Sequence, residues 1–340
     1  MSNLEELRWN TLKNINFPIN ILKQVVRDKF KCEVKEDDID EFIKKIDSYT
    51  EIDDKKKLLF LLERNAFKKL SVFFIKSIHI DEICNLFKLD FINRNQMMFL
   101  KDNEQLIGIG EELKCTYYSE NERYFIIKQA LVKTIEIEQS PDSYSQIKDY
   151  EYYDFVKYVI DKDEEIVFMF YNDINSIAKE SDEDKSKIFT KKKMSFYNMF
   201  TNGNKYSLKN YSINCELDKY IFNLLEDLND SQDNHLNKTV TLIETEDPKN
   251  SRNNYRSGKI DGKHNIYSLN AIKYSLENEG HNVKSIWCII NDREFLLKNK
   301  GEIILTEPYF GMEVIEDVCK EIFADYSLYH GREQATGTNY

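Results

Sequence analysis

Apolar residues in the first 65 positions recur every three or four residues, which is the spacing of one face of an α-helix. The first series consists of Ile21, Leu22, Val25, Val26 and Phe30. The second series consists of Ile39, Phe42, Ile43 and Ile46. Pro18 and the pair Asp37–Asp38 stand where helices begin, because a first turn tolerates proline and favours negative charge. The pattern predicts a helical module over residues 1–65 that docks through its second series and carries no chemistry.

From residue 66 to residue 228 the pattern changes to short apolar runs separated by polar turns, which is typical of β-strands. We expect strands at Leu70–Ile75, Gln96–Leu100, Gln105–Ile109, Cys115–Tyr118, Tyr124–Ile127 and Glu165–Tyr171. Val132–Ile137 fits either a strand or a helix, and Tyr150–Ile160 fits a helix. Residues 179–188 are polar and charged, and we expect a loop there. These runs predict a central α+β domain over residues 66–228, built on a mostly antiparallel sheet.

A polar segment at residues 229–238 follows a helical series that ends near Leu228, and we place a domain boundary there. Beyond it the pattern predicts strands at Val240–Ile243 and Ile286–Ile290, and a hairpin of Phe295–Leu297 with Ile303–Leu305. Helices are expected through Leu269, Ile272 and Leu276, ending at Gly280, and over Val314–Phe323. The chain is therefore expected to be α+β, with a C-terminal α/β domain over residues 238–330 and a mobile tail over residues 331–340.

The distribution of charge along the chain is more informative about its partners than the net charge. Lys and Arg number 48 against 60 Asp and Glu, a formal charge of −12. A chain this acidic is repelled by nucleic acid unless its cations are segregated. They are: Lys185–Cys215 contains no acidic residue and interleaves lysines with aromatic residues, as a platform that tracks phosphates and stacks on bases requires. A second cationic segment, Lys249–Lys263, is a long polar loop.

These two segments supply the candidate nucleic-acid contacts. The candidates are Lys187, Lys191, Lys192, Lys193, Lys205, Lys209, Arg252, Arg256 and Lys259. The competing interpretations are a solvated face for the first segment and a disordered insertion for the second, because charged runs often have no other role.

Acidic residues end the strand that precedes the second cationic segment. On an extended strand Glu244 and Glu246 share a face, and with Asp247 they offer oxygen ligands to Mg²⁺. In the alternative that we favour, Arg252 or Arg256 folds back onto these carboxylates and closes the site, because an unpaired buried carboxylate is costly.

The order of strand, loop, helix at 269–279 and strand at 283–290 resembles the core of the PD-(D/E)xK nucleases. That family has a lysine two residues after its acidic ligand, and here Glu246 occupies that place. The resemblance therefore implies a lysine from the loop, Lys263, Lys249 or Lys259, beside Glu244. It also implies a magnesium-dependent cleavage of nucleic acid, in which the metal stabilises the charged transition state.

The remaining chemistry-bearing residues indicate no further site. The six cysteines form no C-x-x-C pair, so the sequence predicts neither a zinc site nor a redox site. No apolar run approaches the length of a membrane span, and the first ten residues are unlike a signal peptide, so we expect a cytoplasmic protein.

Three functions follow from these features. The leading expectation is a non-catalytic, nucleic-acid-associated cytoplasmic protein without a cofactor, with antiviral defence or a mobile element as its setting. The first alternative is the degenerate PD-(D/E)xK-like nuclease with Mg²⁺. The second is a subunit of a larger complex, which would contact a protein partner or a second copy of the chain.

Overall fold

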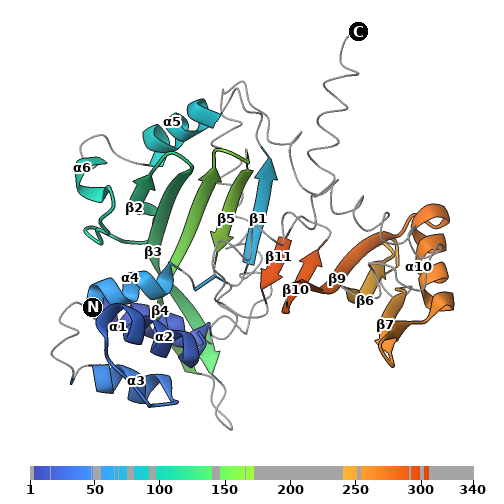
Figure 1. The fold of residues 1–340 in the computed structure, drawn as a ribbon, viewed down its shortest axis with the longest axis horizontal. Coiled ribbons are helices and arrows are strands. Elements are labelled where there is room, and N and C mark those ends of the chain that lie inside the picture. The colour runs from blue at the N-terminus through green and yellow to red at the C-terminus, as the bar shows by residue number, and fades with distance from the viewer. Residues whose placement is uncertain are drawn as a thin grey trace. The chain divides into compact units, whose positions relative to one another are not determined.

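The computed structural model of the chain describes residues 4–15, 17–46, 48, 55–64, 66–67, 69–74, 80–91, 97–139, 146–164, 166–171, 240–250, 254–290, 292–298 and 302–305. These residues form helices and antiparallel strands, which confirms the α+β class (Figure 1). They fall into two compact units, one within residues 4–171 and the other within residues 240–305.

Four helices begin the first unit, and their caps follow from the sequence. They are α1 (Leu4–Asn14), α2 (Ile19–Phe30), α3 (Ile39–Ile46) and α4 (Lys55–Glu63). Pro18 lies just before α2, and its carbonyl accepts from the N–H groups of the first turn. The Asp38 carboxylate accepts from the backbone N–H of Asp40 and of Glu41, an N-cap that satisfies two otherwise unpaired donors. The predicted helical character of this segment is therefore confirmed, and Phe42 and Ile46 are buried as its second series requires.

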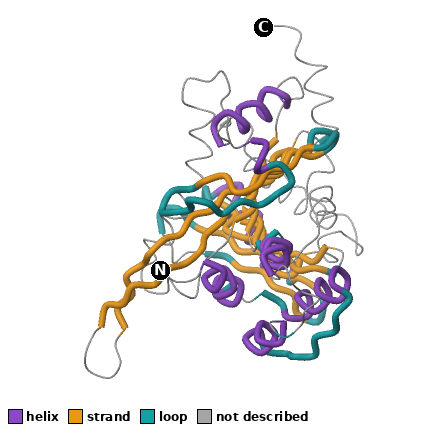
Figure 2. Tube along the Cα trace, turned by 90° about the vertical axis from the view of Figure 1, so that its left-hand side faces the viewer, coloured by secondary structure: helices purple, strands orange, loops and turns teal. Residues whose placement is uncertain are grey.

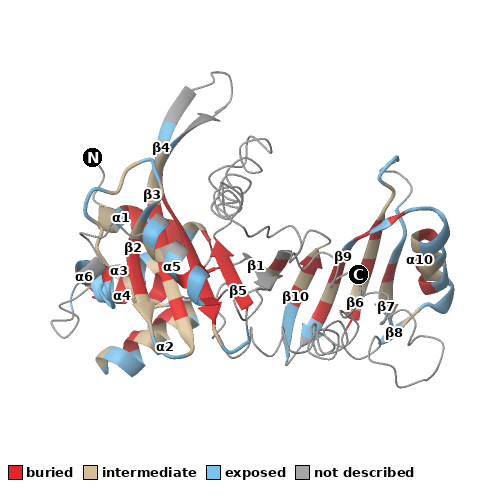
Figure 3. Cartoon of the chain, turned by 90° about the horizontal axis from the view of Figure 1, so that it is seen from above, coloured by how far each residue is buried: buried red, intermediate tan, exposed pale blue. Residues whose placement is uncertain are grey.

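The sheet of the first unit has the strand order β2-β3-β4-β5-β1, with every neighbouring pair antiparallel. Its strands are β1 (Lys69–Phe74), β2 (Lys114–Glu120), β3 (Tyr124–Gln139), β4 (Gln146–Asp161) and β5 (Ile166–Tyr171). Helix α5 (Ile80–Phe91) buries Ile83 and Cys84 against one face, where they meet Phe125 and Tyr158. Helix α1 packs on β4 from the opposite face, whose side chains alternate with those of the first. The sheet is thus covered on both sides, and β5 is buried along its whole length (Figure 3).

Strand β4 corrects one prediction. The sequence indicates a helix at Tyr150–Ile160, but these residues lie in β4 and pair with β3 in register from Tyr124↔Asp161 to Gln139↔Gln146. Residues 152–161 are all buried, so the strand shows no alternation of polar and apolar positions. The strand alternative for Val132–Ile137 is correct, because these residues belong to β3.

Strands β3 and β4 extend beyond the strands that flank them in the sheet. Strand β2 pairs with β3 only up to Ala130, and β5 pairs with β4 only from Val156 onward. Beyond these points β3 and β4 continue as a two-stranded ribbon, which Figure 2 shows running out from the sheet. The hairpin predicted at Cys115–Tyr118 and Tyr124–Ile127 is confirmed as β2 and β3.

The segment before β2 corrects a second prediction. Instead of two strands at 96–109 there is a short helix, α6 (Met97–Leu100), followed by a loop that lies along the free edge of β2. The N–H of Asp102 donates to the carbonyl of Tyr118, and the N–H of Gln105 donates to the carbonyl of Thr116. The polar residues Lys101–Glu104 indicate a turn between two strands, but they belong to this loop, which covers the edge of β2 through Asp102 and Gln105.

The second unit is an antiparallel sheet with the strand order β11-β10-β9-β6-β7-β8 and one helix. Its elements are β6 (Val240–Glu246), β7 (Arg256–Ile260), β8 (Lys263–His264), α10 (Ile266–Asn278), β9 (Asn282–Ile290), β10 (Arg293–Lys298) and β11 (Glu302–Leu305). The register aligns Ile243, Ile286, Leu297 and Ile303 across four strands, and all four are buried. The strands, the hairpin and the helix expected through Leu269, Ile272 and Leu276 are confirmed, and Gly280 has the left-handed φ of 70° expected after a helix. The segment Lys249–Lys263, expected to be a long polar loop, instead contains β7 and the start of β8.

Several predictions fall outside the described residues. They are the loop at 179–188, the helices near Leu228 and at Val314–Phe323, the boundary at 229–238 and the tail at 331–340. The predicted divisions between domains stay predictions. Among the described helices, none has both the length and the apolar character that a membrane crossing demands.

Candidate functional site

The predicted nucleic-acid contacts divide between described and undescribed segments. Lys187, Lys191, Lys192, Lys193, Lys205, Lys209 and Arg252 lie outside the described residues. Arg256, Lys259, Lys263 and the carboxylates Glu244, Glu246 and Asp247 are described, and all six belong to the second unit.

The carboxylate of Glu244 is surrounded by polar partners. Glu244 and Arg256 stand directly opposite each other on β6 and β7, and Nε of Arg256 lies 3.4 Å from a Glu244 oxygen. The other oxygen accepts from the Ser285 hydroxyl at 3.2 Å and lies 3.8 Å from the ammonium of Lys284. One carboxylate thus lies near two cations and a hydroxyl, and the cross-strand register places Glu244 opposite Arg256.

The neighbouring acids have different surroundings. Asp247 lies in the turn after β6, where its carboxylate accepts from the N–H of Lys249 at 2.8 Å, and it is 3.9 Å from Nε2 of His281. Within the ranges that the structure describes, no three His, Cys, Asp or Glu side chains gather as metal ligands would. Whether Mg²⁺ binds near Glu244 and Glu246 stays an untested alternative.

A histidine fixes the β7–β8 hairpin. Nε2 of His264 lies 3.0 Å from the carbonyl of Val240, so this nitrogen donates, and Nδ1 accepts from the Ser257 hydroxyl at 3.1 Å. Burial lowers the pKa of His264, although the hydrogen bond to Val240 acts in the opposite direction. Ser257 is only 2% exposed, so its hydroxyl is not accessible to a substrate. The two hydrogen bonds of His264 instead connect β8 to β7 and to β6, just before α10 begins.

The outward face of α10 exposes large side chains. Tyr267 is 81% exposed and Tyr274 is 58% exposed, while the helix buries Leu269 and Ile272 on its other side (Figure 3). The hairpin beside it carries Lys259 and Lys263, and burial lowers the pKa of Lys259. Sequence reasoning missed the two tyrosines, although their seven-residue spacing places them opposite the core positions of the same helix.

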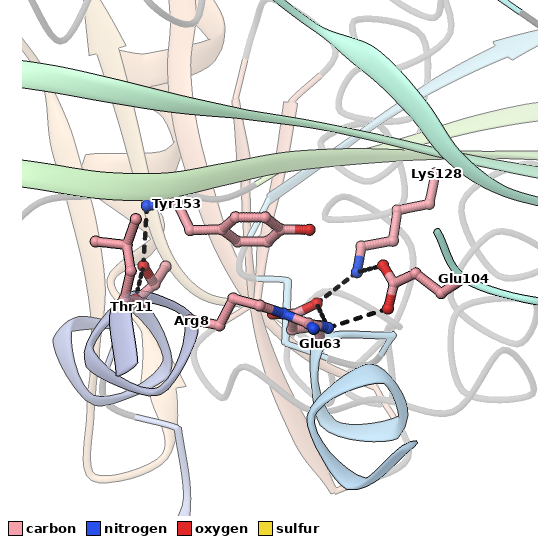
Figure 4. Close-up of polar contacts among 7 residues, drawn as sticks. Arg8, Thr11, Glu63, Glu104, Lys128 and Tyr153 are labelled. Carbon is pink, nitrogen blue, oxygen red and sulfur yellow. Dashed lines mark hydrogen bonds and ion pairs between the residues drawn. The ribbon is translucent and has the colours of Figure 1, made fainter. Parts of the chain in front are cut away.

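The first unit contains a feature that no motif indicated, a cluster of four buried charges (Figure 4). Arg8 of α1 and Glu63 of α4 form two hydrogen bonds, from Nε at 2.7 Å and from Nη2 at 2.8 Å. Lys128 of β3 donates to Glu63 at 2.5 Å and to Glu104 at 2.6 Å. Glu104 also accepts from Nη2 of Arg8 at 3.0 Å. We call Arg8, Glu63, Glu104 and Lys128 the charge cluster.

Pairing within the charge cluster favours the charged forms of Glu63 and Arg8 although both residues are buried. Burial alone would raise the pKa of Glu63, but Lys128 and Arg8 outweigh it and hold that pKa below its ordinary value. Burial would likewise lower the pKa of Arg8, and Glu63 and Glu104 raise it instead. The cluster is electrically balanced, with two cations and two anions.

Tyr153 lies against the charge cluster and links it to the sheet (Figure 4). Its ring centre is 5.5 Å from the Arg8 guanidinium and 5.7 Å from the Lys128 ammonium. Its backbone N–H donates to the hydroxyl of Thr11, which itself donates to the carbonyl of Leu7. Burial, followed by the negative charges of Glu63 and Glu104, holds the pKa of the Tyr153 hydroxyl well above 10.

A cleft of about 860 Å³ opens beside the charge cluster. Its walls come from α1, α4 and the loop before β2. The lining residues are Leu4, Glu5, Arg8, Lys56, Lys57, Phe60, Leu61 and Asp102–Ile107. This volume lies within the range of about 300–1,000 Å³ that small-molecule sites occupy.

A further buried cation, Lys157 of β4, lies on the same sheet face as Tyr153. Its ammonium donates to the carbonyl of Arg64 at 2.8 Å and lies 4.5 Å from the ring centre of Phe170 and 5.1 Å from that of Phe67. Burial, followed by the cations Arg64 and Lys128, lowers the pKa of Lys157 to about 7.

No protein-family model matches this sequence, and no curated protein sequence matches it. The function is therefore argued from the geometry of the two units.

Proposed function

We propose that this protein binds single-stranded nucleic acid through the β7–β8 hairpin and the outer face of α10. The observation that carries the proposal is the pair of exposed rings, Tyr267 and Tyr274. Seven residues apart on one helix face, they are separated by about 10 Å along the axis. Rings exposed to this degree serve as stacking platforms for bases, at about 1–3 kcal/mol for each base.

Cations beside the rings support the proposal. Lys263 is exposed at the tip of the hairpin, Lys259 is half-buried on β7, and Arg256 is largely exposed although it also contacts Glu244. Asp261 is the acid that separates the two lysines. Helix α10 contacts β7, so these cations lie on elements next to the helix that carries the rings. Cations that attract phosphate and rings that stack on bases are together the chemistry of a platform for unpaired strands.

The test measures the affinity of the full chain for labelled 20-nucleotide single strands of DNA and RNA by fluorescence anisotropy, between 50 and 300 mM salt. Replacing Tyr267 and Tyr274 together by Ala should weaken binding at every salt concentration, since stacking depends little on salt. Replacing Lys259 and Lys263 by Glu should weaken binding most at low salt and flatten the salt dependence.

Phe99→Ala is the matched control, because Phe99 of α6 is a 68% exposed ring in the other unit. It should leave the affinity unchanged. The proposal fails if neither strand binds at 50 mM salt, or if the double tyrosine variant binds as tightly as the unmodified protein.

A protein partner is the second candidate for the same surface. Ile260 is 71% exposed on β7, and Ile266 is 57% exposed at the start of α10. Aliphatic side chains of this exposure are typical of protein interfaces rather than of phosphate-binding surfaces. Ile260→Ser with Ile266→Ser separates the two candidates, because it should leave nucleic-acid binding nearly unchanged if bases stack on the tyrosines.

A further inference from the structure

The guanidinium of Arg8 is held rigidly at the edge of the cleft in the first unit. Its Nε and Nη2 donate to Glu63, and Nη2 donates again to Glu104, so one edge of the planar group is fully used. Arg8 is 1% exposed and lines the cleft. Two acids and the ring of Tyr153 fix its position before any ligand arrives.

The other edge of the same guanidinium is unused. An arginine offers five N–H donors, and the two on Nη1 have no acceptor among the residues that the structure describes. Nη1 of Arg8 is not among the described side-chain atoms that are fully buried without a hydrogen-bond partner, and Arg8 lines the cleft, so this edge can be reached from the cleft. Hydrogen bonds from guanidinium to carboxylate or phosphate are among the strongest in proteins. The unused edge therefore selects a ligand that brings an acceptor oxygen.

We propose that the cleft binds a small organic anion, whose carboxylate or phosphate oxygen accepts from Nη1 of Arg8 and whose apolar body lies against Phe60 and Ile107. This site belongs to the first unit and is independent of the surface on α10.

The walls of the cleft suit the body of such a ligand. Phe60 is half-buried in the wall, its ring centre 4.8 Å from that of Tyr117, which holds it in place. Ile107 is 85% exposed at the lip, where an isoleucine gains by being covered. Pockets that combine apolar walls with a few fixed polar groups are the usual form of small-molecule sites.

The charges that line the cleft leave room for an anion. Three cations and three acids line it: Arg8, Lys56, Lys57, Glu5, Asp102 and Glu104. Glu104 is already held by Lys128 and by Arg8, so its charge is compensated within the charge cluster. Lys56 is exposed on the rim and can meet the anionic group of a ligand together with Arg8.

Three probes of one size test the proposal on the full chain by calorimetry and ligand-observed NMR. Benzoate and phenyl phosphate carry the two anionic groups, and benzamide is the neutral counterpart of benzoate. We expect one of the anions to bind with a Kd below about 1 mM and benzamide to bind at least about tenfold more weakly. The tighter of the two anions distinguishes carboxylate from phosphate recognition.

Two surface variants locate the binding. Lys56→Glu and Ile107→Glu should each weaken the anion about tenfold, because each adds a negative charge at the cleft. Lys29→Glu on α2 and Leu89→Glu on α5 are the matched controls, since both residues are exposed and neither lines the cleft. Unchanged circular dichroism verifies that each variant folds.

The proposal is overturned if neither anion binds up to 10 mM, if benzamide binds as tightly as benzoate, or if the control variants weaken binding as much as Lys56→Glu and Ile107→Glu do. Anion binding that only the two cleft variants weaken supports it. Loss of nucleic-acid binding in the α10 variants has no bearing on this result, so the two proposals fail separately.

Discussion

Glu63 is the more deeply buried of the two acids that accept from both cations of the charge cluster. It is fully buried and accepts from Arg8 and from Lys128. In the variant Glu63→Gln these two buried cations would face the single charge of Glu104. Breaking a buried ionic arrangement in this way costs about 3–5 kcal/mol, so we expect the free energy of unfolding to fall by that amount.

Urea unfolding of the full chain measures this loss. Glu112→Gln is the control, because Glu112 is exposed before β2, and it should change the free energy of unfolding by less than about 0.5 kcal/mol. A loss below about 1 kcal/mol in Glu63→Gln would contradict the assignment of Glu63 as the centre of the charge cluster.

Lys157 gives the stability of the protein a dependence on pH. Its pKa is about 7 in the folded chain, well below the ordinary 10.5, so the unfolded state binds more protons between these values. The contribution of this residue to stability therefore rises as pH increases from 7 to 10.5. Lys157→Met should stabilise the protein by about 1–4 kcal/mol near pH 7, because it removes a buried cation.

The advantage of Lys157→Met should shrink as pH approaches 10, which urea unfolding between pH 7 and pH 10 measures. Lys29→Met replaces an exposed lysine and should show a difference that does not change with pH. If the difference between Lys157→Met and the unmodified protein is constant over this range, the lowered pKa is wrong.

The charge cluster could not have been predicted from single residues. In the sequence Arg8, Glu63, Glu104 and Lys128 lie far apart, and charged residues such as these are most often exposed to solvent. Their burial depends on partners up to 96 positions away, and no local pattern carries that information. Glu244 differs, because its contact with Arg256 joins two residues of adjacent strands, and we considered that pairing from the sequence.

At the scale of elements, the predictions succeeded for α10 and for the short, wholly apolar strand β5, and failed for the long strand β4, whose buried positions include polar residues. Helix α10 has one apolar face, an Asn265 cap and a terminating Gly280, and it was predicted near its observed bounds. Strand β4 is buried on both faces, so the sequence lacks the alternation that identifies a strand. The loop before β2 failed for another reason, since its polar residues are held by the edge of a sheet.

The docking of α1 on the sheet is an element-scale prediction. Leu12 of α1 is fully buried, and α1 packs on β4. Leu12→Ala should lower the free energy of unfolding by about 2–5 kcal/mol, because it leaves a cavity between helix and sheet. Asn10→Ala is the control, since Asn10 is exposed on the same helix, and its effect on urea unfolding should be small.

A loss in Leu12→Ala no larger than that in Asn10→Ala would show that α1 contributes little to the fold. Helices α1, α2 and α3 each bury apolar side chains, while the docking of residues 1–65 as a separate module stays a prediction. The sequence did not indicate that α1 and α4 would also carry half of the charge cluster, Arg8 and Glu63.

At the scale of the whole molecule, the net charge of −12 does not show that cations occur in two different environments. In the first unit Arg8 and Lys128 are buried and balanced by acids. In the second unit Lys263 and Arg256 remain at the surface beside exposed rings. The sequence shows that cations are segregated along the chain, but which of them are buried and which are exposed depends on the fold.

The distances along the chain that the charge cluster spans have a consequence for the order of folding. Its four contacts join segments 55, 65, 96 and 24 residues apart. Closing such loops costs entropy before any ionic contact forms, so α1, α4, the loop before β2 and β3 must first be brought together by apolar burial. We therefore expect the cluster to form after the rate-limiting step. Interactions that form after the transition state lower the unfolding rate and leave the folding rate nearly unchanged. We therefore expect the charge cluster to slow the unfolding of the first unit without making it fold faster.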